Sequence, residues 1–218
     1  MSNRSFLGDT ISDYVRALSE PPDEVQTALI DATTAATGDW APMQIDTDQG
    51  AFMSILTAVL QPRFAVEVGT FTGYSALAVA RALPADGRLL CCDVSEEWTA
   101  IARKHWELAR LTDRIDLVIA PAIETLSNLP ADPPIDLAFI DADKEAYVAY
   151  YEAILPRLSD RGVILVDNTL WSGTVADPAV SEESAVALRA FNDHVLADPR
   201  SEVALLSIGD GVTIIRRR

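Results

Sequence analysis

The stretch FAVEVGTFTGYSALAVA, residues 64–80, places a strand, a glycine turn and a helix in immediate succession. Residues 64–68 are apolar apart from Glu67, and a helical apolar pattern follows Gly73. A strand that is apolar on both faces is typical of a parallel sheet covered by helices on either side. The stretch therefore predicts an α/β fold whose ligand site lies beyond a strand end.

The same alternation continues along the chain. Strands are predicted over 64–69, 88–94, 114–120, 135–141 and 162–168, and helices over 73–82, 96–109, 122–129, 144–158 and 181–197. Two apolar runs flank Gly209-Asp210-Gly211, which is a hairpin signal and makes the last strands antiparallel. The pattern predicts a doubly wound, mostly parallel seven-stranded sheet with a C-terminal antiparallel hairpin.

Residues 1–60 are predicted to form N-terminal helices and residues 61–218 the α/β core of a single domain, 1–218. Helical sequence over 10–37 is interrupted at Pro21-Pro22, and Thr47 is expected to cap a helix over 48–60. The apolar face expected for this last helix comprises Phe52, Ile55, Leu56, Val59 and Leu60.

The charge and apolar content limit the partners. With 33 acidic and 17 basic residues the net charge is −16, which argues against nucleic acid or an anionic membrane as partner. No apolar run reaches the roughly 20 residues of a membrane span, and the N-terminus has no signal-peptide pattern. A cytoplasmic protein is expected, with the adjacent Cys91 and Cys92 as small core residues in a reducing compartment.

The glycine turn suits an adenosine ligand. Gly69 and Gly73 let the backbone approach a ligand and turn into the helix. Position 71 is Phe rather than Gly, so the dinucleotide fingerprint is not matched and a pyrophosphate is disfavoured. Asp93 ends the second strand, where an acid accepts hydrogen bonds from ribose hydroxyls. The alternatives are a purely structural turn and a surface acid.

Oxygen-bearing side chains end two further strands. Asp141 follows the fourth strand, and Asp167 and Asn168 follow the fifth. Adjacent strands lie about 4.8 Å apart, so these side chains converge, and two carboxylates with an amide oxygen suit Mg²⁺. A calcium loop starting at Asp141 is disfavoured because its sixth position is Ala146 rather than Gly.

Lys144 is unusual in a chain that prefers arginine. Only Lys104 and Lys144 are lysines among the 17 basic residues. A lysine three residues from a predicted metal ligand indicates that its ability to lose a proton matters. The alternative is an exposed lysine at a helix start.

Four motifs together resemble one enzyme family. MQIDTDQG, VEVGTFTGYSALAVA, FIDADKEAY and LVDNTLWSG are similar to segments of the cation-dependent catechol and caffeoyl-CoA O-methyltransferases, which are class I S-adenosylmethionine-dependent enzymes. The resemblance extends from about Trp40 to the C-terminus. It implies a Rossmann-like methyltransferase fold with the antiparallel hairpin, and a homodimer.

The resemblance also implies roles for individual residues. The cofactors would be S-adenosylmethionine and Mg²⁺, or another divalent cation such as Mn²⁺ or Ca²⁺. Lys144 would be the general base. The implied cofactor contacts are Met43, Ile45, Glu67, Gly69, Ser75, Asp93, Ala122 and Asp141, and the implied metal ligands are Asp141, Asp167 and Asn168.

The expected reaction is methylation of one hydroxyl of a small aromatic diol. Trp40, Trp171 and the loop 169–180 are expected to clamp the aromatic ring, unless either tryptophan belongs to the core. A coenzyme A ester is disfavoured because the N-terminal arm offers only Arg4 and Arg16 for its phosphates. A metal-independent methyltransferase and a non-catalytic adenosine-binding protein stay open as alternatives.

Overall fold

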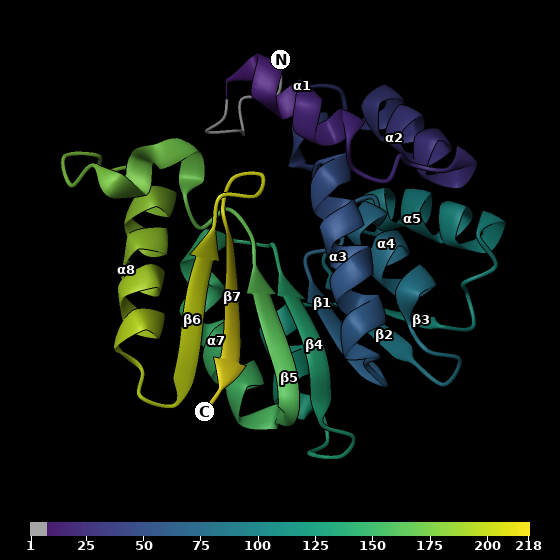
Figure 1. The fold of residues 1–218 in the computed structure, drawn as a ribbon. Coiled ribbons are helices and arrows are strands. Elements are labelled where there is room, and N and C mark those ends of the chain that lie inside the picture. Colours follow the sequence, from purple (N-terminus) through teal and green to yellow (C-terminus); the bar gives the residue numbers. More distant parts are fainter. Residues whose placement is uncertain (1–7) are drawn as a thin grey trace.

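A seven-stranded sheet in the order β3-β2-β1-β4-β5-β7-β6 forms the centre of the computed structural model, which describes residues 8–218 (Figure 1). The strands are β1 (Phe64–Val68), β2 (Arg88–Asp93), β3 (Ile115–Ile119), β4 (Ile135–Ile140), β5 (Leu158–Val166), β6 (Ser201–Leu206) and β7 (Val212–Arg217). The strands β1 to β5 pair in parallel, whereas β7 is antiparallel to both β5 and β6. The predicted sheet and its terminal hairpin are confirmed.

Helices cover both faces of the sheet. They are α1 (Asp9–Ala17), α2 (Glu24–Thr37), α3 (Thr47–Leu60), α4 (Tyr74–Ala82), α5 (Glu96–Leu108), α6 (Ala122–Asn128), α7 (Tyr147–Ile154) and α8 (Glu183–Ala197). One hydrophobic core lies between the sheet and α6 to α8, and a second lies between the sheet and α2 to α5. Side chains alternate between them along β1, because Val66 and Val68 join the first core and Ala65 the second.

The predicted helix over 144–158 was wrong as a single element. It consists of the short 3₁₀ segment η2 (Lys144–Ala146), then α7, then the 3₁₀ segment η3 (Leu155–Arg157). Pro156 in η3 has no N–H to continue the α-helical hydrogen bonds, which explains the change at this point. The strand β5 also begins earlier than predicted, at Leu158. Cys91 and Cys92 are free, buried core residues, as predicted.

The predicted face of α3 is correct in part. Phe52, Leu56 and Leu60 are partly buried and pack against the second core, as predicted. Ile55 and Val59 are instead 65% and 70% exposed. The fully buried positions are Gln49, Gly50, Met53 and Thr57. A Cβ on Gly50 would lie 2.8 Å from the ring of Tyr74, so the backbone of α3 comes close to α4 at this point. Thr47 is inside the helix, and the N-cap is Asp46, which makes no side-chain capping bond.

The strand order reverses at β1, which has β2 on one side and β4 on the other. The carboxyl ends of β1 and β4 approach closely: a Cβ on Gly69 would lie 1.9 Å from the carbonyl oxygen of Asp141, and Gly69 has φ +87°. Helices α1 and α2 lie at this end of the sheet (Figure 1). Ligands of doubly wound sheets bind at such a reversal. Among residues 8–218, no helix combines the length and apolarity needed to span a bilayer.

Candidate active site

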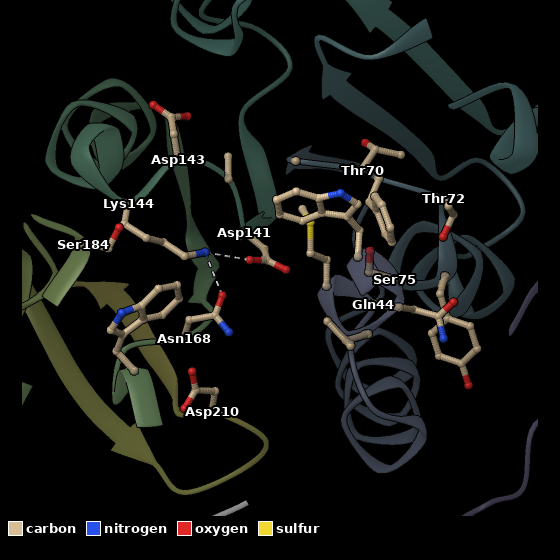
Figure 2. A pocket seen from close by; sticks show the side chains of 18 of the residues that line it. Gln44, Thr70, Thr72, Ser75, Asp141, Asp143, Lys144, Asn168, Ser184 and Asp210 are labelled. Carbon is tan, nitrogen blue, oxygen red and sulfur yellow. Dashed lines mark hydrogen bonds and ion pairs between the residues drawn. The ribbon is translucent and has the colours of Figure 1, made fainter. Parts of the chain in front are cut away.

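A cavity of about 500 Å³ opens at the carboxyl ends of the strands. The predicted site residues that line it are Trp40, Met43, Ile45, Gly69, Ser75, Asp141, Lys144, Asn168 and Trp171. The predicted residues that do not line it are Glu67, Asp93, Ala122 and Asp167. Figure 2 shows Lys144, Asp141 and Asn168 on one side of the cavity and Thr70, Thr72 and Ser75 on the other.

Lys144 is held by three oxygen atoms. Its Nζ donates hydrogen bonds to Asp141 Oδ1 at 2.9 Å, to Asn168 Oδ1 at 2.7 Å and to the Tyr147 hydroxyl at 2.7 Å. The dashed lines in Figure 2 mark the first two. An ammonium group has three donors, so all of them are used. With 10% of its side chain exposed, Lys144 is not the exposed helix-start lysine of the alternative interpretation.

Asp167 is buried and directly precedes Asn168, one of the residues that hold Lys144. Its Oδ2 accepts a hydrogen bond from Gln49 Nε2 at 2.8 Å, and its Oδ1 accepts one from the Asn168 N–H at 2.7 Å. Burial and the charge of Asp141 raise the pKa of Asp167 to about 7, although Gln49 and Lys144 act in the opposite direction. The ammonium group of Lys144 therefore pairs directly with Asp141 and acts on Asp167 through its charge alone.

These residues suit a divalent cation. The oxygens of Asp141 and Asn168 already converge on one positively charged nitrogen, and Asp167 adds a second carboxylate to the group. Hard cations such as Mg²⁺ prefer oxygen ligands of this kind. A carboxylate oxygen that accepts one hydrogen bond keeps another lone pair, so the bonds of Asp167 leave it able to bind a cation.

A second acidic group does not compete for this role. Glu152, His194 and Asp198 come close enough together to hold a metal. However, Arg200 already forms ion pairs with Glu152 at 2.7 Å and with Asp198 at 2.6 Å. A guanidinium group therefore supplies the positive charge there.

Glu67 is buried beneath the glycine turn on the opposite side of the cavity. Its Oε2 has no hydrogen-bond partner within residues 8–218, and Cys91 Sγ lies 3.7 Å from its Oε1. Burial raises the pKa of Glu67 to about 8, against the nearby hydroxyls of Ser75 and Thr70. A buried carboxyl group with an unpaired oxygen suits the amino group of a ligand.

Asp93 has an additional task that its sequence position did not indicate. Its Oδ2 accepts from the Thr70 and Phe71 N–H groups, both at 2.8 Å, and its Oδ1 accepts from the Ser95 N–H at 2.8 Å. Asp93 therefore fixes the glycine turn from outside the cavity. Ala122 is the buried first residue of α6 and likewise lies outside the cavity.

The two predicted tryptophans lie at the cavity, and Trp171, which is partly buried, also packs against the core on the α6 to α8 side of the sheet. Trp40, in the 3₁₀ segment η1 (Gly38–Met43), is 62% exposed. Trp171 begins η4 (Trp171–Ala176), and its Nε1 donates to Glu182 Oε2 at 2.9 Å. Trp171 and Ser172 have φ values of +44° and +53°. Non-glycine residues rarely adopt this conformation, which here turns the chain back at the rim of the cavity.

Sequence reasoning missed several residues around Lys144. Tyr147 follows Lys144 by three positions, a spacing that places both side chains on one side of a helical turn and could have identified it. Gln49 is 118 positions from Asp167, so no local pattern indicates their contact. The other missed residues that line the cavity include Gln44, Asp143, Glu145, Ser184 and Asp210.

Comparison with known proteins shows consistent similarities. The family model described as O-methyltransferase matches residues 17–218. The caffeoyl-CoA O-methyltransferase of Petroselinum crispum is 34% identical, with 100% of this chain and 95% of that protein covered. The flavonoid 3',5'-methyltransferase of Vitis vinifera is also 34% identical, over 100% of this chain and 99% of that protein. The crystal structure of the SAH-bound methyltransferase PaMTH1 of Podospora anserina has a TM-score of 0.87 at 29% identity, over 96% and 94% of the two chains.

Proposed function

Since the chain belongs to the O-methyltransferase family and is an S-adenosylmethionine-dependent enzyme, we propose that it methylates one hydroxyl of a catechol-type aromatic diol with the help of a divalent cation. The observation that carries the proposal is the convergence of Asp141 and Asn168 on Lys144 Nζ, at 2.9 and 2.7 Å, at the edge of the cavity. In this proposal a metal site would lie beside a proton acceptor.

We propose that the methyl donor binds against the glycine turn. Glu67 would accept a hydrogen bond from the amino group of the donor. Gly69 and Ser75 would lie against the methionine portion of the donor. Met43 and Ile45 would flank the same portion. Asp93 would accept hydrogen bonds from the ribose, and Ala122 would lie near the adenine. Asp141 would lie near the transferred methyl group. When bound, the cofactor supplies a methyl group on a positively charged sulfur.

Asp141, Asp167 and Asn168 would hold the divalent cation. When bound, such a cation lowers the pKa of a neighbouring hydroxyl group. The negative charge of Asp141 and Asp167, only partly balanced by Lys144, supports this assignment.

Lys144 would act as the general base. In its neutral form, Nζ would take the proton of the reacting hydroxyl while that oxygen attacks the methyl group, and the sulfur would leave as a neutral thioether. Hydrogen bonds that the ammonium form donates to Asp141, Asn168 and Tyr147 fix the position of Nζ. The neutral amine keeps two of these donors, and its lone pair would face the reacting hydroxyl. Positioning of reacting groups supplies about 7–11 kcal/mol in favourable cases, and Trp40 and Trp171 would hold the aromatic ring in place.

The charges around the cavity favour a free diol over a coenzyme A ester. Among the described residues that line it, Lys144 is the one cation, against Asp141, Asp143, Glu145 and Asp210. Arg16 already pairs with Asp13 and Asp46, and Arg4 lies outside the described residues. A nucleotide with three phosphates would meet a negative surface.

We also propose a cytoplasmic homodimer. The apolar side chains left exposed on α1 and α3, such as Tyr14 and Val59 at 65% and 70%, support a contact between two copies.

A panel of acceptors tests the proposal. Diols, the matching monophenols and a caffeoyl ester of coenzyme A are each incubated with S-adenosylmethionine and Mg²⁺, with and without chelator. We expect chelator-sensitive methylation of the diols. Methylation that persists in chelator would favour a metal-independent enzyme, preference for the ester would favour the alternative acceptor, and no turnover with any acceptor would favour a binding protein.

A further inference from the structure

Gln49 connects the N-terminal helices to the proposed metal site. It lies in the first turn of α3, is 2% exposed, and donates from Nε2 to Asp167 Oδ2 at 2.8 Å. The other oxygen of Asp167 accepts from the Asn168 N–H at 2.7 Å. Both carboxylate oxygens of Asp167 therefore accept a hydrogen bond from the protein. The carboxylate cannot rotate without losing one of these buried hydrogen bonds.

The side chain of Gln49 lies against the turn between β6 and β7. A Cβ on Gly209 in this turn would lie 2.5 Å from Gln49 Oε1, so the turn packs closely on the amide. The next residue of α3, Gly50, lets the helix backbone approach the ring of Tyr74. With its carbonyl oxygen facing Gly209, the amide presents its NH₂ group to Asp167.

We propose that Gln49 is a positioning residue that orients the Asp167 carboxylate for divalent-cation binding. The inference rests on the proposed function, in which Asp167 is a metal ligand. It assigns a role in cation affinity to a residue of α3 that would not touch the cation.

The residue type supports this role. A glutamate at position 49 would remove the donor and place another carboxylate beside Asp167 and Asp141. An apolar residue would leave Asp167 Oδ2 buried without its partner. A neutral donor avoids both effects, and hydrogen bonds of this kind to metal ligands commonly affect metal affinity by about 10–100-fold.

Direct binding of Mn²⁺ tests the proposal. The free ion is quantified by electron paramagnetic resonance with the parent, Gln49→Met and Gln49→Glu. Gln49→Met keeps the length of the side chain without the donor, and Gln49→Glu keeps its shape. The matched control is Met53→Ala, a buried change one turn further along α3 that creates a cavity in the second hydrophobic core.

We expect the Kd for Mn²⁺ to rise about tenfold or more in both Gln49 variants. The affinity for S-adenosylhomocysteine, measured by calorimetry, should stay at the parent value. Met53→Ala should lower Tm and leave the Kd for Mn²⁺ unchanged. If Gln49→Glu does not fold, Gln49→Met decides alone.

Two results would overturn the inference. The first is a folded Gln49→Met with the parent affinity for Mn²⁺, and the second is equal or tighter binding by Gln49→Glu. A parent protein that binds no Mn²⁺ would instead remove the proposed metal site itself, so the two failures are distinguishable.

Discussion

Lys144 Nζ and Asp141 Oδ1 lie 2.9 Å apart in an ion pair whose side chains are only 10% and 19% exposed. Asp141 follows β4 and Lys144 begins η2, so the pair stands at the reversal of strand order. An ion pair removed from water contributes little net stability because desolvation opposes the Coulomb attraction. The place of this ion pair at the edge of the cavity therefore favours a role in the reaction over a role in stability.

The first prediction concerns the proton acceptor. Lys144→Arg keeps the positive charge, but arginine does not lose its proton at working pH. We expect kcat for an unactivated catechol to fall by about 10²–10⁴-fold, with a smaller loss for nitrocatechols, whose hydroxyl ionises more readily. Steady-state kinetics measure this, with the exposed Lys104→Arg on α5 as control. Turnover of the unactivated catechol at the parent rate would refute the base assignment.

The second prediction concerns the proposed metal ligands. Asp167→Asn keeps the shape of the side chain and removes one negative charge from the group around Lys144. We expect Mg²⁺ to lose its stimulation of turnover, while calorimetry gives the parent affinity for S-adenosylhomocysteine. The control is Asp136→Asn, on β4, whose Oδ2 accepts from the Arg63 N–H at 2.9 Å. Full Mg²⁺-stimulated turnover by Asp167→Asn would contradict the three-ligand site.

Sequence reasoning grouped Asp141, Asp167 and Asn168 correctly, because adjacent parallel strands place their carboxyl ends at one edge of the sheet. Asp141 directly follows β4 and Asp167 directly follows β5. The role of Glu67, in contrast, came only from the resemblance to methyltransferases. An acid inside an apolar strand gives no such indication by itself.

The faces of α3 could not be predicted in the same way. Apolar periodicity placed Phe52, Leu56 and Leu60 correctly against the core. It also favoured Ile55 and Val59 as buried, but these are exposed, and the helix buries Gln49 and Gly50. The reason is tertiary: Gln49 bonds to Asp167, and Gly50 admits the ring of Tyr74. A helix beside a polar site buries polar and small residues, and these contacts join segments far apart in the chain.

The third prediction separates two tasks of Asp93. It accepts backbone hydrogen bonds from Thr70, Phe71 and Ser95, and it is also proposed to accept from the ribose. Each hydrogen bond to a charged group contributes about 1.5–3 kcal/mol, so Asp93→Ala should weaken S-adenosylhomocysteine binding by at least about tenfold. Asp116→Ala, at an exposed position of β3, is the control.

A deoxyribose analogue of S-adenosylhomocysteine distinguishes the two tasks. If Asp93 contacts the ribose, removing the 2'-hydroxyl should cost affinity in the parent and much less in Asp93→Ala. An equal loss in both proteins would assign Asp93 to the turn alone.

The fourth prediction concerns pH. Burial raises the pKa of Glu67 from 4.5 to about 8, so between these values the folded protein holds a proton that the unfolded chain releases. Raising the pH in this window therefore favours unfolding, by up to about 1.4 kcal/mol for each pH unit. Glu67→Gln removes this contribution, so its free energy of unfolding should fall less steeply with pH than that of the parent. Urea unfolding across the window measures both slopes, and identical slopes would show that Glu67 is ionised in the folded protein.

Methyl transfer from S-adenosylmethionine to an unactivated catechol, followed by mass spectrometry in chelator and after Mg²⁺ is restored, tests the central claim most directly. The account predicts that chelator reduces formation of the monomethyl ether to background and that Mg²⁺ restores it, while the corresponding monophenol is not methylated. Undiminished methylation of the catechol in chelator, or methylation of the monophenol at the same rate, would contradict the account.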